Sequence, residues 1–88
     1  MTVSYLSLGK ASALTLGAAL KTLRLRKGMS SRRLAEVCGF SAAYISKIES
    51  DSTIPSSKFL AKIFEVLECS QEEMVFILGV LLKDDNES

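Results

Sequence analysis

The chain has 88 residues, enough for one small domain, and 48% of them are apolar, which is sufficient for an unassisted hydrophobic core. It contains two cysteines without a Cys-x-x-Cys pair and no histidine, so a zinc site and histidine-based catalysis are not expected. The net charge of +1 is unevenly divided, because residues 1–48 carry eight basic residues and one acid, whereas residues 49–88 carry three basic residues and nine acids. Local charge governs attraction to phosphate, so the first half, at +7, is suited to nucleic acid despite the small total.

Residues 1–14 leave three interpretations open: a short strand, an extra helical turn, or an N-terminal arm that is either flexible or associated with a second subunit. No positive charge occurs in residues 1–8, which argues against a signal peptide, and the apolar run 11–20 is too short to span a bilayer. We therefore expect a cytoplasmic protein without a membrane segment. A role for this arm at a membrane surface is a minor alternative.

The first helix is predicted from Leu16 to Lys27, with Thr15 as its N-cap and Gly28 as its C′ residue. Leucines at positions 16, 20 and 23 recur at the spacing of a buried helical face. Basic residues crowd the second half of this segment, where they suit the negative end of the helix dipole.

Two short helices joined by a tight turn are predicted next, over about 30–38 and 42–50. Gly39 allows the chain to turn, and Ala35 is small enough for the helices to approach each other. Two isoleucines, Ile45 and Ile48, would hold the second helix against the first. Cys38 lies on the inner face of this corner, and Cys69 lies in a later apolar pattern, so both are expected to be reduced core residues.

The remaining chain predicts two further helices. One follows Pro55 and runs from about Ser56 to Leu67, and the other begins at a Ser70/Glu73 capping box and ends near Lys83, before a polar tail over 84–88. The last helix is apolar on all sides, which is unusual for the surface of a monomer. We expect it to pair with the same helix of a second copy through Val75, Phe76, Leu78, Leu81 and Leu82. Cover by the N-terminal arm is the alternative.

Taken together, residues 16–75 resemble the lambda-repressor/Cro-like, or XRE-type, helix-turn-helix family. The resemblance rests on matches spread along the segment: Leu20, Leu23 and Arg24, then Gly28-Met29-Ser30, Leu34-Ala35, Gly39, Ile45-Ser46, Ile48-Glu49, Pro55, Leu60, Ile63 and Leu67. It implies an all-α, five-helix domain with the helix-turn-helix at its second and third helices. It also implies an ion pair between Arg24 and Glu49.

The resemblance further implies double-stranded DNA as the partner, with the third helix in the major groove. The side chains expected to face the bases are Ser41, Ala42, Ala43, Tyr44, Ser46 and Lys47. Those expected to hold phosphates are Ser30, Ser31, Arg32, Ser50, Ser52 and Thr53.

Two features depart from the family pattern. The family often places glutamine where this chain has Ser31, and base-pairing side chains where it has Ala42 and Ala43. Alanine can touch a thymine methyl group but cannot hydrogen-bond a base edge. DNA shape is therefore expected to contribute to recognition.

These observations favour a transcriptional regulator, most often a repressor in this family, that binds a two-fold symmetric operator as a homodimer. No catalytic residues, cofactor or metal are expected. The alternative is a protein-interaction module on the same fold, an antitoxin or antirepressor, whose main partner is another protein.

Overall fold

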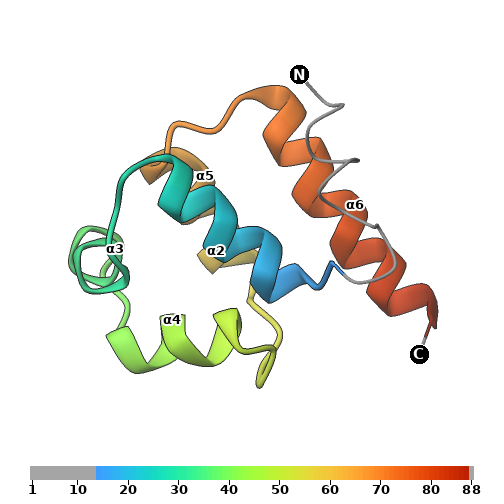
Figure 1. The fold of residues 1–88 in the computed structure, drawn as a ribbon, viewed down its shortest axis with the longest axis horizontal. Coiled ribbons are helices and arrows are strands. Elements are labelled where there is room, and N and C mark those ends of the chain that lie inside the picture. The colour runs from blue at the N-terminus through green and yellow to red at the C-terminus, as the bar shows by residue number, and fades with distance from the viewer. Residues whose placement is uncertain (1–13, 88) are drawn as a thin grey trace.

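The computed structural model describes residues 14–87, with side chains through residue 83, and this part of the chain contains five helices and no strand. They are α2 (Leu16–Arg26), α3 (Ser31–Cys38), α4 (Ala42–Glu49), α5 (Ser57–Val66) and α6 (Gln71–Glu87) (Figure 1). The predicted all-α fold is confirmed. The predicted arm, residues 1–14, lies outside the described residues except for Leu14, which packs against the core.

A hydroxyl side chain begins every one of these helices. Each oxygen accepts a hydrogen bond of 3.0–3.1 Å from the backbone N–H three residues later, which satisfies a donor that the helix itself leaves unpaired. The five capping residues are Thr15, Ser30, Ser41, Ser56 and Ser70. The helix starts inferred from these residues are therefore correct to within one position.

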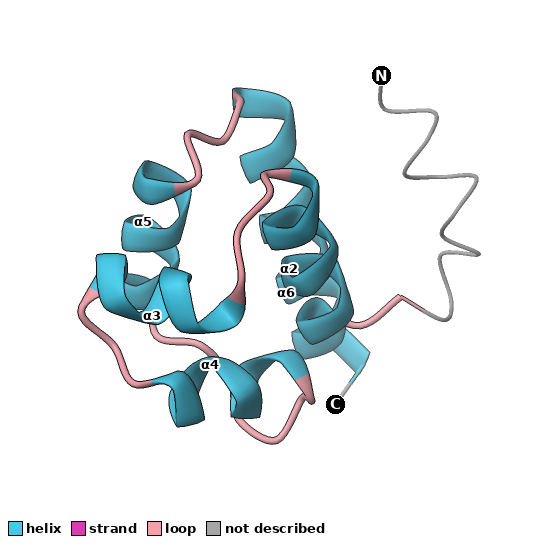
Figure 2. Cartoon of the chain, turned by 60° about the vertical axis from the view of Figure 1, so that its left-hand side comes forward, coloured by secondary structure: helices cyan, strands magenta, loops and turns pink. Residues whose placement is uncertain are grey.

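The core lies between the five helices, each of which contributes buried side chains (Figures 1 and 2). Four large side chains are essentially inaccessible to solvent: Ile45, Ile48, Ile63 and Ile77. Phe59 is also 2% exposed, a burial that the helical patterns in the sequence did not predict. Its ring contacts those of Phe40 and Tyr44 edge-on, with both pairs of centroids 5.1 Å apart, an arrangement that aromatic rings favour.

The helix α6 is longer than predicted and has two distinct faces. It continues to Glu87, four residues past the expected end at Lys83, so residues 84–87 extend the helix instead of forming a tail. Phe76 and Leu81, expected at a subunit interface, are half-buried and pack against the chain's own core. The other three predicted interface residues, Val75, Leu78 and Leu82, are 63%, 41% and 61% exposed.

The capping box at the start of α6 also joins it to α2. The Ser70 N–H donates to Glu73 Oε1 at 2.9 Å, and the Glu73 N–H donates to Ser70 Oγ at 3.1 Å. Lys27 Nζ lies 3.1 Å from the same Glu73 oxygen. Burial acts to raise the pKa of Glu73. It is outweighed by the hydrogen bonds from the Ser70 N–H and Lys27 and by the positive charges of Lys27 and Arg26, so the pKa lies below its ordinary value.

We expect Glu73→Gln to lower the free energy of unfolding at pH 7 by about 1 kcal/mol. Because the folded-state pKa is depressed, the stabilisation from the carboxylate is complete above the unfolded-state pKa, about 4.3, and is lost as pH falls through the lower folded value. Urea unfolding of both proteins at pH 7 and pH 3 measures this. The difference should shrink at pH 3, whereas Glu65→Gln, an exposed control on α5, should have little effect at either pH. A difference for Glu73→Gln that is independent of pH would contradict the assignment.

Candidate nucleic-acid interface

The helices α3 and α4 form the predicted corner. Gly39 adopts φ 77° and ψ 24°, a left-handed conformation that glycine enters without steric penalty. The N–H groups of Gly39 and Phe40 both donate to the Ala35 carbonyl, at 2.9 and 3.1 Å, and so close the end of α3. In Figure 1, α3 is seen nearly end-on while α4 lies across the view, so the two helix axes cross steeply. Such a corner presents its second helix at the molecular surface.

The outer side of α4 is free of the core. Ile45 and Ile48 point inward, with 1% and 2% of their surface exposed. The exposed residues at or after its N-cap are Ser41, Ala42, Ala43, Ser46 and Lys47. Five of the six side chains predicted to face bases are thus brought together on one accessible edge, with Lys47 as its only ionic group.

Tyr44, the sixth, is placed differently. It was expected to face outward, but it is half-buried, because its ring stacks on Phe40 at 5.4 Å and meets Phe59 edge-on. Its hydroxyl accepts a hydrogen bond of 3.3 Å from the Ser56 N–H at the start of α5. The ring therefore ties α4 to α5. The phenolic oxygen uses only its acceptor function in this contact, so its own hydrogen can still be donated.

An ion pair holds the C-terminal end of α4. Arg24 Nε and Nη2 donate to the two carboxylate oxygens of Glu49, at 2.6 and 2.9 Å, and Arg24 Nη1 donates to the Met29 carbonyl at 2.8 Å. The Arg24 side chain is only 8% exposed and that of Glu49 13%. The hydrogen bond to Glu49 raises the pKa of Arg24, with burial acting against it. The contact implied by the family resemblance is present.

A second contact at this end of α4 was not foreseen. The Gly17 N–H, in the first turn of α2, donates to Asp51 Oδ1 at 2.9 Å. A Cβ atom on Gly17 would lie 2.4 Å from the Ile48 carbonyl oxygen and 2.7 Å from that of Glu49. Asp51 takes φ 63°, a left-handed conformation that aspartate tolerates better than most residues. The α2 and α4 backbones therefore touch directly, with glycine required between them.

The start of α3 offers candidate phosphate ligands. Ser30 caps the helix as an acceptor, so its hydroxyl hydrogen remains available for a phosphate oxygen. Ser31 and Arg32 occupy the first two positions of α3, half-buried and exposed respectively. Arg33 lies 3.5 Å from Glu36, whereas no ion pair is found for Arg32 within the described residues. Arg32 is the better placed of the two arginines.

The loop after α4 is less suited to phosphate than the sequence suggested. Ser50 Oγ donates to the Lys47 carbonyl at 3.2 Å, and the Ser50 and Ser52 hydroxyls share a hydrogen bond of 2.9 Å. The backbone N–H groups of residues 50–52 also bond to carbonyls at the end of α4. Phosphate binding by Ser50, Ser52 and half-buried Thr53 stays a prediction, and for the two serines it requires these bonds to be exchanged.

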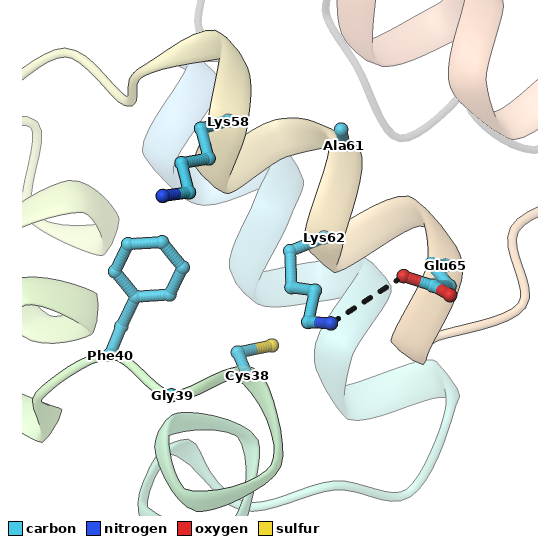
Figure 3. A pocket seen from close by; sticks show the side chains of 7 residues that line it. All are labelled: Cys38, Gly39, Phe40, Lys58, Ala61, Lys62 and Glu65. Atoms are coloured by element: carbon cyan, nitrogen blue, oxygen red, sulfur yellow. Dashed lines mark ion pairs between the residues drawn. The ribbon is translucent and has the colours of Figure 1, made fainter.

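A depression lies between the α3–α4 turn and α5 (Figure 3). Lys58 and Lys62 extend over it from α5, and Cys38 and Phe40 line it from the turn. Lys62 Nζ lies 3.7 Å from Glu65, but Lys58 has no such partner among the described residues. Sequence reasoning missed Lys58, since it falls in the acidic half of the chain.

Both cysteines are free thiols, Cys38 buried and Cys69 half-buried. Burial raises the pKa of the Cys38 thiol, and the charge of Lys62 partly opposes this. Burial and the charge of Glu73 raise the pKa of the Cys69 thiol, and the charge of Lys27 partly opposes them. A raised pKa disfavours the reactive thiolate. Over the described residues, no three potential ligands cluster in a way that could hold a metal ion, and no helix has the length and apolar character needed to cross a bilayer.

Comparison with known proteins agrees with this geometry. A family model described as helix-turn-helix matches residues 20–73. Among solved structures, the chain is similar to the crystal structure of the clp gene regulator ClgR from Corynebacterium glutamicum, with a TM-score of 0.64 and 32% sequence identity, over 82% of this chain and 79% of that chain. No curated protein matches. The matched residues include the α3–α4 corner and both partners of the Arg24–Glu49 ion pair.

Proposed function

Because this chain belongs to the XRE-type helix-turn-helix family of DNA-binding regulators, we propose that it is a transcriptional repressor that binds a two-fold symmetric operator as a homodimer. The α4 helix enters the major groove, and its exposed edge faces the bases. The protein acts by occupying DNA and has no catalytic role.

The observation that supports this proposal most is the division of α4 into two sides. Its inner side is buried through Ile45 and Ile48, and its end is fixed to α2 by the Arg24–Glu49 pair. Its outer side carries only small side chains and Lys47. A helix held in this way can lie close to the floor of a groove, because no bulky exposed side chain keeps it away.

Phosphate contacts would fix the orientation of α4 on the DNA. We assign this role first to Ser30, Ser31 and Arg32 at the start of α3, where helix N–H groups also favour an anion. Lys58, in the first turn of α5, adds a positive charge beside the α3–α4 turn. Tyr44 can contribute the hydroxyl hydrogen that its contact with Ser56 leaves free.

Base recognition on this edge is limited by its chemistry. Ala42 and Ala43 can contact thymine methyl groups, whereas Ser41, Ser46 and Lys47 can form hydrogen bonds with base edges. The remaining discrimination must come from the width and deformability of the groove. We therefore expect an operator with a few strongly preferred base pairs and a wider preference for DNA shape.

We expect Lys47→Ala to weaken operator binding by about 1–2 kcal/mol, since it removes the only charge on the exposed edge of α4. A band-shift titration at several salt concentrations, on an operator selected from random DNA, measures this effect. Affinity should fall as salt rises, with a log–log slope of about −0.9 for each phosphate contact. The matched control is Lys62→Ala, which removes the same charge from a lysine already beside Glu65 and should bind nearly as well. Binding that is insensitive to salt, or equal for the two variants, would rule out this docking mode.

A further inference from the structure

The outward face of α6 carries an unbroken apolar surface. At about 100° per residue, Val75, Leu78, Gly79 and Leu82 lie within about 100° of one another around the helix, on the side opposite buried Ile77. All four are exposed, and a Cβ added to Gly79 would meet no atom within 4 Å. A helix side that is apolar and solvent-exposed over this length is typical of a contact surface.

The arrangement of this face is complementary to itself when two copies run antiparallel. The pair of positions 75 and 82 and the pair 78 and 79 have the same midpoint along the helix. With a two-fold axis through that midpoint, Val75 meets the partner's Leu82, and Leu78 meets the partner's Gly79. Because glycine has no side chain, it offers a space into which the leucine can pack, and the helix axes can approach closely.

The charges that border this face fit the same arrangement. Glu72 and Lys83 are both exposed and lie at about 60° and 80° from Val75, on one side of the apolar surface. Flanking residues on the same side of two antiparallel helices face each other, so Glu72 of one copy lies beside the partner's Lys83, and the reverse contact repeats across the axis. The offset from exact opposition is two residues, about 3 Å along the helix, which side chains of this length can span.

We propose that two copies of this chain associate through an antiparallel α6–α6 contact, with Leu78 packed onto the partner's Gly79 and two symmetric Glu72–Lys83 pairs at its border. The inference rests on the proposed homodimeric function and specifies its interface. In this interface the relative orientation of the two subunits is determined by Glu72 and Lys83, which lie outside the DNA-contacting corner.

Sedimentation equilibrium of the full chain tests this contact. The unmodified chain should form a dimer, and Glu72→Lys or Lys83→Glu alone should each raise the dimer Kd about tenfold, because both symmetric pairs become repulsive. The double variant Glu72→Lys/Lys83→Glu should return the Kd to within about threefold of the original. An equimolar mixture of the two single variants should also associate, because each mixed pair is again attractive. Glu65→Lys changes the charge equally on α5 and should have no effect. Circular dichroism confirms that each variant is folded.

A second variant examines the apolar contact. Gly79→Gln should raise the thermal stability of the isolated subunit, because glutamine favours an exposed helix position, yet it should weaken dimerisation by filling the space for the partner's Leu78. A monomeric chain, or a dimer unaffected by both charge reversals and by Gly79→Gln, would overturn the proposal; in either case residues 1–13 or another protein would be the occupant of this face. A double variant that fails to restore association would exclude the antiparallel register.

The failure of this interface can be distinguished from failure of the proposed function. If the chain is monomeric but still binds DNA in a salt-dependent way and loses affinity with Lys47→Ala, only the α6 contact is wrong. If the charge exchange restores the dimer but Lys47→Ala has no effect on DNA binding, the interface stands and the docking of α4 is wrong.

Discussion

Gly17→Ala is expected to lower the free energy of unfolding by about 3 kcal/mol, although it places a better helix former inside a helix. The added Cβ would lie 2.4 Å from the Ile48 carbonyl oxygen, 2.7 Å from that of Glu49 and 2.8 Å from Asp51 Oδ1. Two of these atoms belong to the backbone of α4, so relief requires α2 and α4 to move apart. The separation would also stretch the hydrogen bond from the Gly17 N–H to Asp51.

Thermal and urea unfolding at low chain concentration would measure this effect. The matched control is Gly79→Ala, which makes the same change in an exposed part of α6 where the new methyl group meets no atom of its own subunit, and low concentration keeps the chain monomeric. That variant should be unchanged or more stable by up to about 1 kcal/mol. Equal responses of the two glycines would show that α2 and α4 do not touch as described.

Arg24→Ala is expected to destabilise the chain by about 3–5 kcal/mol, because it leaves the Glu49 carboxylate and the Met29 carbonyl, both held by one guanidinium, without their partner. Arg24→Lys should recover only part of the loss, since an ammonium group cannot form the two-pronged contact with Glu49 and also reach Met29. DNA affinity should fall beyond the loss of folded protein, because α4 is released at one end.

A double-mutant cycle isolates the interaction between the two side chains. Glu49→Leu alone should be costly, but Arg24→Met combined with Glu49→Leu should lose less than the sum of the single changes, because no buried charge is stranded. Stabilities that add simply would show that the two residues act independently.

Local sequence patterns were sufficient for the parts of the fold that depend on neighbouring residues. A hydroxyl followed by an apolar helical pattern located each helix start, and Gly39 located the turn, because capping and left-handed conformations are determined within a few residues. The Arg24–Glu49 pair spans 25 positions and came from the family resemblance instead.

The features that were missed depend on contacts between distant positions. Gly17 and Asp51 are 34 residues apart, and nothing near either residue indicates that two backbones meet there. Tyr44 was assigned to the outer side of its helix because Ile45 and Ile48 were assigned to the inner side, but the approach of Phe59 from α5 half-buries it. The length of α6 was underestimated because residues 84–87 are polar, a composition that the end of a helix can share with an irregular tail.

The attachment of α4 at both ends has a kinetic consequence. Tyr44 joins its first turn to α5, and Glu49 joins its last turn to α2, so both ends of the helix are fixed to neighbouring helices. The conformational entropy of such a helix is lost when the chain folds, so DNA binding carries no further cost for ordering it. The helix therefore has the same conformation before and after binding. It can slide along non-specific DNA without rearranging. Any change of shape needed for a close fit must then come from the DNA duplex. Lifetimes on different sites should accordingly reflect how easily each site bends to fit one fixed helix.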